Sequence, residues 1–273
     1  MTMAVRIGIT IIIAYGVLVL TVFLLQRKMI YFPDRQRPSE VHVRSLNLTF
    51  WPKDAETFKG YTGAVPPRKQ KGTVIAFHGN AGSAWQRDYF VHAIEPLGFR
   101  VVLAEYPGYG GRSGETKESS FVADAMTIVQ QVFDQSEGPV YLLGESMGCG
   151  VVAAVAANSP VPIAGLVLIT PWDSLPDLAQ SLYWYLPARH LTRDRYDSVS
   201  NLITFDKPVA VAIAEADEVV PSRHSMRLYD ALSAPKRLWR FKGAGHNSWP
   251  ANPGDKWWEE AMLFLTTGER DID

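Results

Sequence analysis

A serine flanked by glycines is the first feature of this sequence that could do chemistry. The pentapeptide GESMG places Ser146 two residues after Gly144 and two residues before Gly148. Apolar runs on either side predict a strand over 139–143 and a helix over 147–158. A sharp strand-to-helix turn strains its central residue and leaves little room for neighbouring side chains. We therefore predict that Ser146 is a nucleophile raised above a sheet, with both glycines making room for the turn.

A serine nucleophile needs a base. A hydroxyl is a weak nucleophile at neutral pH, so a histidine must accept its proton and a carboxylate must orient that histidine. On a strand–turn–helix architecture, both partners are expected after the serine, acid first, in loops that follow later strands. Three histidines follow Ser146. His246 lies in the Gly-rich segment FKGAGHNSW after the last apolar run, where a base is expected. His224 is the main alternative, and His190 lies in an aromatic insertion.

The orienting acid is expected in the segment VAIAEADEVVP, which follows an apolar run. This segment holds Glu215, Asp217 and Glu218. Asp217 lies closest to the point where the chain turns, so we favour it over Glu218, whose ordinary role would be that of a solvated loop carboxylate. Asp173 and Asp177 are less suitable, because they follow an earlier strand and lead into the insertion.

An oxyanion formed during attack needs two N–H donors. One is expected from Met147, the residue after the nucleophile, and the other from the loop after the predicted strand 72–80, where Asn80 is the best candidate for a backbone donor. His78 precedes the serine at a strand end, so we predict a structural role for it. The glycine-rich stretch 105–115 lacks both common phosphate-binding patterns and is interpreted as a tight turn.

Elements that would position these residues alternate along the chain. Predicted strands cover 42–51, 56–65, 72–80, 99–108, 139–143, 164–169, 208–214 and 237–241. Predicted helices cover 83–97, 116–135, 147–158, 222–232 and 254–266. This alternation predicts an α/β fold with a mainly parallel central sheet and helices on both faces.

Residues 171–206 interrupt this alternation. They insert roughly 35 residues between two strands, which is longer than an ordinary connection. The segment LAQSLYWYLP within them is aromatic and apolar enough to cover something. We predict a small lid over the carboxyl edge of the sheet, with an ordinary crossover helix and a long loop as the alternative.

The amino terminus predicts a membrane anchor. No charged residue occurs over 7–25, and about 20 apolar residues cross a bilayer. A cleaved signal peptide would have a shorter apolar core and a small-residue cleavage site, so we predict an uncleaved anchor over 1–28 and a catalytic domain over 29–273. A buried core helix is the alternative. More basic residues follow the run than precede it, which favours a cytoplasmic catalytic domain and leaves the opposite orientation open.

Composition narrows the function classes further. The net charge is −1, with 27 basic and 28 acidic residues, so nucleic-acid binding has little support. The single cysteine, Cys149, excludes an intramolecular disulfide, and its small neighbours favour a buried structural thiol over a reactive one. Cysteines and histidines show no zinc-like spacing. We therefore expect no metal and no organic cofactor.

Six short motifs together resemble a known family. They are FHGNAG, EYPGYGGRSGE, GESMG, TPWDSLPDLA, ADEVVP and GAGHN, in that order. From about Ile30 to Leu265 the chain resembles the α/β-hydrolase superfamily, and within it the membrane-anchored serine hydrolases of the ABHD type. The apolar amino terminus running into RKMIYFP is similar to that branch as well. Two departures are small: Glu105 stands where the family more often has Asp, and Ser248 stands where an acid is frequent.

The resemblance implies an α/β-hydrolase fold with a small lid and an amino-terminal transmembrane helix. It also implies site residues that agree with the selection made from the residues alone. They are Ser146 as nucleophile, Asp217 as acid, His246 as base, and Asn80 and Met147 as backbone donors.

The sequence thus predicts a membrane-anchored serine hydrolase that cleaves acyl ester or thioester bonds through an acyl-enzyme. An apolar insertion and a membrane anchor favour lipid-like or acylated substrates at the bilayer surface. A peptidase or amidase on the same fold is the main alternative, because the same triad serves both bonds. An inactive anchored scaffold is a third hypothesis, which the complete set of serine, acid and histidine argues against.

Overall fold

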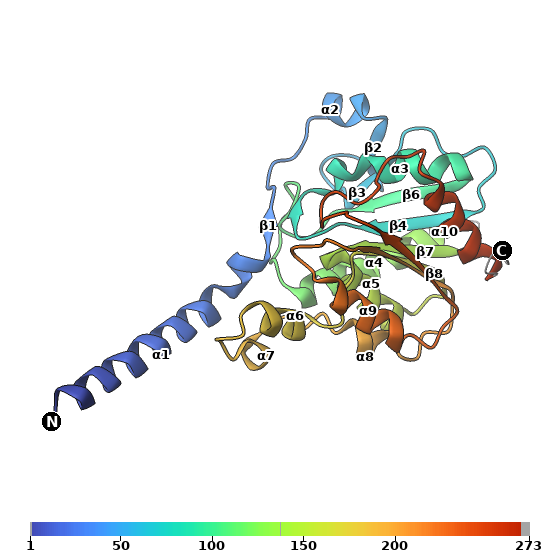
Figure 1. The fold of residues 1–273 in the computed structure, drawn as a ribbon. Helices are drawn as coiled ribbons and strands as arrows, with labels where there is room; N and C mark the ends of the chain where they lie inside the picture. The colour runs from blue at the N-terminus through green and yellow to red at the C-terminus, as the bar shows by residue number, and fades with distance from the viewer. Residues whose placement is uncertain (1, 137, 269–273) are drawn as a thin grey trace.

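The computed structural model describes residues 2–136 and 138–268. An eight-stranded sheet has the order β10–β9–β8–β7–β4–β6–β3–β2 (Figure 1). Its strands are β2 Leu48–Trp51, β3 Gly60–Gly63, β4 Gly72–Phe77, β6 Phe99–Ala104, β7 Val140–Glu145, β8 Ile163–Ile169, β9 Val209–Ala214 and β10 Lys236–Phe241. The strands from β10 to β6 are parallel, whereas β3 and β2 are antiparallel to their neighbours. The α/β fold with a mainly parallel sheet is confirmed.

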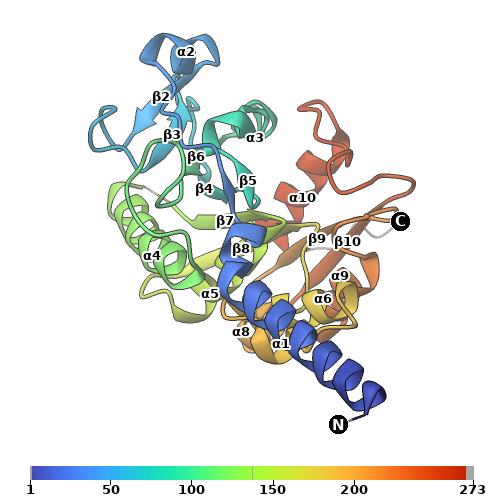
Figure 2. The same cartoon turned by 90° about the vertical axis from the view of Figure 1, so that its left-hand side faces the viewer.

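Helices cover both faces of this sheet, as Figures 1 and 2 show. One face carries α4 Glu118–Gln135, α5 Met147–Asn158 and α9 Ser222–Ala231, and the other carries α3 Asp88–Ile94 and α10 Lys256–Thr267. Successive strand side chains point to opposite faces. In β4, Ile75 and Phe77 therefore join one core, and Val74 and Ala76 join the other.

Two predicted elements differ from the structure. Residues 42–45 of the predicted strand 42–51 are helical, in α2 Glu40–Ser45, because the Ser39 side chain caps that helix by accepting the N–H of His42. The predicted helix 83–97 is broken into η1 Ala84–Arg87, α3 and η2 Glu95–Leu97. The α-helical part ends at Ile94, two residues before Pro96, which has no backbone N–H to donate within a helix.

The amino-terminal helix α1 Met3–Ile30 projects from the domain (Figure 1). It is long and apolar enough to cross a membrane, with a mean hydropathy of 2.6 in its most apolar window. It extends two residues beyond the predicted boundary at 28. A single residue, Tyr31, separates it from β1 Phe32–Pro33, which pairs in parallel with β5 Ala81–Gly82. The helix therefore joins the domain that contains the sheet without a linker.

Polar contacts hold the end of α1 against the insertion 171–206. The Arg27 guanidinium donates two hydrogen bonds of 2.9 Å to the carboxylate of Asp194, which also accepts from the Tyr31 hydroxyl at 3.0 Å. That hydroxyl lies 3.0 Å from the Tyr196 hydroxyl. The Gln26 side chain bonds two backbone groups of the insertion. These contacts fix the direction in which α1 leaves the domain.

The insertion contains three short helices, α6 Leu175–Leu182, α7 Ala188–Leu191 and α8 Ser198–Leu202. The last packs against α5 and behaves as a crossover helix. Residues 175–191, here named the cap, lie beside α1 in both views (Figures 1 and 2). The α8 part of the segment agrees with the crossover-helix alternative. The division into anchor, catalytic domain and lid stays a prediction.

Candidate active site

Ser146 lies at the junction of β7 and α5, at the sharp turn that the glycine spacing indicates. Its φ of 52° and ψ of −115° place it in a region that L residues rarely adopt. A Cβ on Gly148 would lie 2.0 Å from the Phe77 carbonyl oxygen, and one on Gly144 would lie 2.6 Å from the Cys149 Cα. Any larger residue at either glycine would clash with backbone atoms.

His246 and Asp217 come from the loops after β10 and β9 and meet the serine at the carboxyl edge of the sheet. The Nε2 atom of His246 lies 2.9 Å from the Ser146 Oγ, and its Nδ1 atom lies 2.7 Å from Asp217 Oδ2. The other Asp217 oxygen accepts the N–H groups of Val219 and Val220, at 2.9 and 2.7 Å. Each of the three catalytic candidates is less than a tenth exposed. This arrangement can move a proton from Ser146 to a histidine whose orientation is fixed.

Glu218, the rival acid, contacts the histidine loop differently. Its Oε2 atom accepts the backbone N–H of His246 at 3.1 Å and does not orient the imidazole ring. The Ser248 hydroxyl accepts the N–H of Gly245 at 2.8 Å and supports the same loop. Glu218 and Ser248 therefore hold the backbone around the ring, while Asp217 holds the ring itself.

The two candidate oxyanion donors flank the serine. Met147 begins α5, so its N–H has no partner within the helix. Within the described residues, the backbone N–H of Asn80 donates to no backbone acceptor. A Cβ on Gly79 would lie 3.6 Å from the Ser146 Cβ, so the Asn80 loop passes directly beside the serine. Both N–H groups are therefore available to an oxyanion formed there.

The Asn80 loop is tied to the end of α1, a connection that the sequence did not predict. The Asn80 side chain donates to the carbonyl oxygen of Ile30 at 2.7 Å. The Asn80 carbonyl accepts from the Phe32 N–H at 3.0 Å and from the Tyr109 hydroxyl at 2.8 Å. The loop that carries a candidate donor is thus hydrogen-bonded to the junction between α1 and β1.

His78 fastens the base of the same loop, in agreement with the structural role predicted for it. Its Nε2 atom lies 3.0 Å from Glu105 Oε1, and its Nδ1 atom lies 2.8 Å from the Gly79 carbonyl. Glu105 is fully buried and also accepts from the Ser83 hydroxyl and the Ala84 N–H. The sequence analysis did not predict this hydrogen-bond network. Its signal in the sequence was Glu105, an acidic residue directly after an apolar strand.

His224, the rival base, belongs to a separate chain of hydrogen bonds. Its Nδ1 atom lies 2.8 Å from Asp173 Oδ1, and its Nε2 atom lies 2.8 Å from the Ser181 Oγ. The Ser181 hydroxyl donates to the Leu178 carbonyl within α6, so it is not a free nucleophile. Burial raises the pKa of Asp173, but hydrogen bonds from His224 and Ser174 outweigh burial and leave it below its usual value. We interpret these hydrogen bonds as a structural connection between α6 and α9.

The remaining candidates have structural positions. Cys149 is fully buried with its Sγ 3.1 Å from the Gly144 carbonyl, and burial raises the pKa of its thiol. His190 is exposed on α7, and Asp177 lies in the first turn of α6, where its N–H is capped by Ser174. In the described part of the chain, His190 and Asp177 make no hydrogen bond with Ser146, and the backbone N–H of Cys149 donates to the Ser146 carbonyl at 2.9 Å within the turn.

Glu145, the residue before the nucleophile, forms a buried ion pair. Its Oε2 atom lies 3.0 Å from the Arg87 Nε, and its Oε1 atom accepts from the Tyr89 hydroxyl at 3.2 Å. Burial acts to raise the pKa of Glu145, but the charge of Arg87 and these hydrogen bonds outweigh it. The pKa of Glu145 is therefore below its ordinary value.

Replacing Arg87 with methionine is expected to lower the free energy of unfolding at neutral pH by about 2–4 kcal/mol, because Glu145 is left charged and buried. In the variant, the charge of Arg87 no longer opposes burial, so the pKa of Glu145 rises, and the deficit should shrink as the pH falls and Glu145 becomes protonated. Urea unfolding at neutral and acidic pH measures this. Arg87→Met/Glu145→Gln should recover most of the loss, and a double variant no more stable than Arg87→Met would contradict the pairing.

Comparisons with known proteins agree with this fold. The profile of the Hydrolase_4 family, described as serine aminopeptidase, S33, matches residues 68–190. The protein Rv2307c of Mycobacterium tuberculosis is 30% identical over 266 residues, covering 95% of this chain and 94% of its own length. The lysophosphatidylserine lipase ABHD12 of Danio rerio is 26% identical, covering 80% of this chain and 66% of its own length. The esterase Pf2001 of Pyrococcus furiosus superposes with a TM-score of 0.62 at 18% identity, covering 87% of this chain and 97% of its own.

The sequence similarity to Rv2307c extends over nearly the whole chain, and the structural similarity to Pf2001 covers 87% of it. The relative at 30% identity matches 95% of this chain. The solved esterase structure, at lower identity, shows the same fold. We conclude that the chain is a hydrolase and belongs to the α/β-hydrolase superfamily.

Proposed function

We propose that this protein is a serine hydrolase that cleaves carboxylic ester or thioester bonds. The observation that carries the proposal is the position of His246 between the other two residues, with one ring nitrogen 2.9 Å from the Ser146 Oγ and the other 2.7 Å from Asp217. A serine, a histidine and a carboxylate in this order form the unit that activates a hydroxyl for attack on an acyl group.

In the proposed mechanism, the Ser146 Oγ attacks the acyl carbon while His246 Nε2 takes the hydroxyl proton. The N–H groups of Met147 and Asn80 stabilise the negative charge on the carbonyl oxygen, and Asp217 stabilises the imidazolium. His246 then gives its proton to the leaving alcohol or thiol, which leaves an acyl-enzyme. Water attacks that intermediate with His246 as base, and the acid departs as Ser146 regains its proton.

The proposed substrates are lipid-like or acylated molecules at a membrane. Support comes from α1, which is apolar, almost wholly exposed and long enough to span a bilayer. The similar protein of Danio rerio is named a lysophosphatidylserine lipase. We propose a single-pass anchor over 1–28, with the domain 29–273 on the cytoplasmic side, because basic residues follow the apolar run.

A peptidase is the second candidate, because the matching family profile is described as a serine aminopeptidase. The two functions separate in one assay of the full-length protein in detergent micelles, with p-nitrophenyl butyrate and leucine p-nitroanilide as substrates. We expect kcat/KM for the ester to exceed that for the anilide by at least about 100-fold. The reverse preference would favour the peptidase, and turnover of neither substrate would contradict both.

A further inference from the structure

An apolar cavity lies between α1 and the cap. Its volume is about 140 Å³. The walls are almost entirely aliphatic or aromatic side chains from both segments. They include Val19, Phe23 and Ile30 on α1, and Leu178, Ala179 and Leu182 on α6. Walls of this kind favour an apolar ligand, because a polar group placed against them would lose its hydrogen bonds.

One end of the cavity lies at Ile30, which is hydrogen-bonded to the loop beside Ser146. Ile30 lines it, and the carbonyl oxygen of Ile30 accepts the hydrogen bond from the Asn80 side chain at 2.7 Å. Gly79, the residue before Asn80, lies against Ser146. A ligand in this end of the cavity is therefore only one loop away from the serine hydroxyl.

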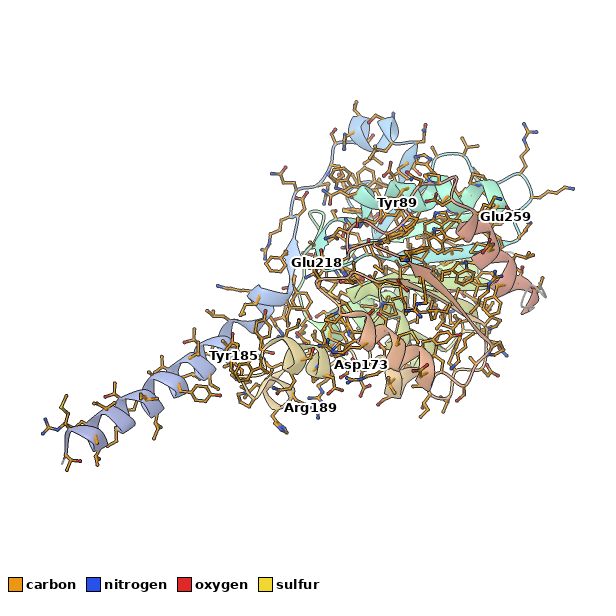
Figure 3. All side chains as sticks on the ribbon, viewed as in Figure 1. Tyr89, Asp173, Tyr185, Arg189, Glu218 and Glu259 are labelled. Carbon is orange, nitrogen blue, oxygen red and sulfur yellow. The ribbon has the colours of Figure 1, made fainter. Side chains whose placement is uncertain are left out.

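The other end follows α1 toward its middle. The Tyr15 hydroxyl donates to the carbonyl of Tyr185 in the cap at 2.8 Å, and Figure 3 shows Tyr185 beside α1. Tyr15 precedes Leu25, the last residue of the uncharged run, by ten residues, which is about 15 Å along a helix. The hydrocarbon core of a bilayer is about 30 Å thick, so this distance equals about one leaflet.

The tip of the cap is itself suited to lipid. Trp184 is 79% exposed and Tyr185 is 50% exposed, next to a helix that is apolar along the same length. Tryptophan and tyrosine rings carry large apolar surfaces, and moving such surface out of water is favourable. With α1 across a bilayer, the cap would dip into the same leaflet, and the cavity would open to lipid chains and not to water.

We propose that this cavity binds the single long acyl chain of a membrane lipid, an inference that rests on the ester hydrolase function proposed above. The chain enters sideways from the leaflet between α1 and the cap, and its ester group reaches Ser146 past Ile30 and Asn80. A polar ligand does not fit, because it would lose its hydrogen bonds to water against nearly uniform apolar walls. The anchor is then one wall of the substrate site as well as an attachment.

Filling the cavity tests this proposal. In the full-length protein in detergent micelles, Ala179→Phe is expected to lower kcat/KM for p-nitrophenyl palmitate by at least about tenfold and to change that for p-nitrophenyl butyrate by less than about twofold. Ala188→Phe, which fills the cavity from α7, should behave in the same way. The matched control is Ala157→Phe at the exposed end of α5, which should leave both esters unaffected.

An unchanged rate with palmitate, or an equal fall for both esters in a protein with native circular dichroism, would overturn the acyl-chain site. If the native protein cleaves neither ester, the ester hydrolase function itself has failed.

A measurement that needs no turnover is photolabelling of Ser146→Ala in phosphatidylcholine vesicles by a diazirine derivative of palmitic acid. Cross-links should map to peptides from 19–30 or 175–192 and disappear in Ser146→Ala/Ala179→Phe. Cross-links confined to other peptides would also overturn the proposal.

Discussion

Replacing Ser146 with alanine is expected to lower kcat on p-nitrophenyl butyrate by about 10⁵-fold or more, because the Ser146 hydroxyl, 2.9 Å from His246 Nε2, is the group that would form the acyl-enzyme. Labelling by a fluorophosphonate probe should disappear in the same variant. The free energy of unfolding should not fall, since the strained backbone at this turn depends on the flanking glycines and not on the hydroxyl. Steady-state kinetics, probe labelling and thermal unfolding measure the three effects.

Ser181→Ala is the matched control for this prediction, because Ser181 also contacts a histidine that contacts an aspartate. Its hydroxyl already donates to the Leu178 carbonyl, and it lies on a cap helix without a strained turn. We expect labelling and kcat within about twofold of the native protein. Loss of labelling in Ser181→Ala and its retention in Ser146→Ala would assign the nucleophile to the cap.

The second large effect is expected from Asp217→Asn, which should lower kcat by about 10⁴-fold. An asparagine can turn its NH₂ group toward His246 Nδ1, which places the ring proton on Nε2 and prevents that nitrogen from accepting the serine proton. Because the amide keeps the shape of the carboxylate, most of the fold should be retained. Kinetics on p-nitrophenyl butyrate, with circular dichroism to verify folding, measure the effect.

Glu218→Gln separates the two candidate acids. Glu218 accepts only the backbone N–H of His246, and a glutamine oxygen can accept the same bond. We expect kcat to fall by less than about tenfold. A loss in Glu218→Gln as large as that in Asp217→Asn would mean that Glu218 orients the imidazole in solution.

The parts of the site that could be predicted depend on local patterns and on chain order. The glycine spacing and the flanking apolar runs placed Ser146 between a strand and a helix, and the helix has the predicted bounds, 147–158. His246 and Asp217 were selected because a parallel sheet brings the loops after successive strands to one edge. Their mutual contacts agree with that selection.

The parts that could not be predicted depend on contacts between residues far apart in sequence. The Arg27–Asp194 pair joins positions 167 residues apart, and the Asn80–Ile30 bond joins positions 50 apart. No propensity or periodicity in either segment signals such a partner. The error at 42–45 has a local cause, because alternating apolar residues there were outweighed by the Ser39 cap.

The absence of a spacer between α1 and β1 has a kinetic consequence. Tyr31 alone separates the helix from a strand that pairs with the Asn80 loop, so Ser146, the proposed nucleophile, would stay at a constant height above the lipid headgroups if the protein is anchored. An enzyme on a long tether samples the surrounding water, whereas this one would search for substrate by lateral diffusion in two dimensions. Its rate would then follow the mole fraction of substrate within the membrane, so that added inert lipid slows turnover and added buffer does not.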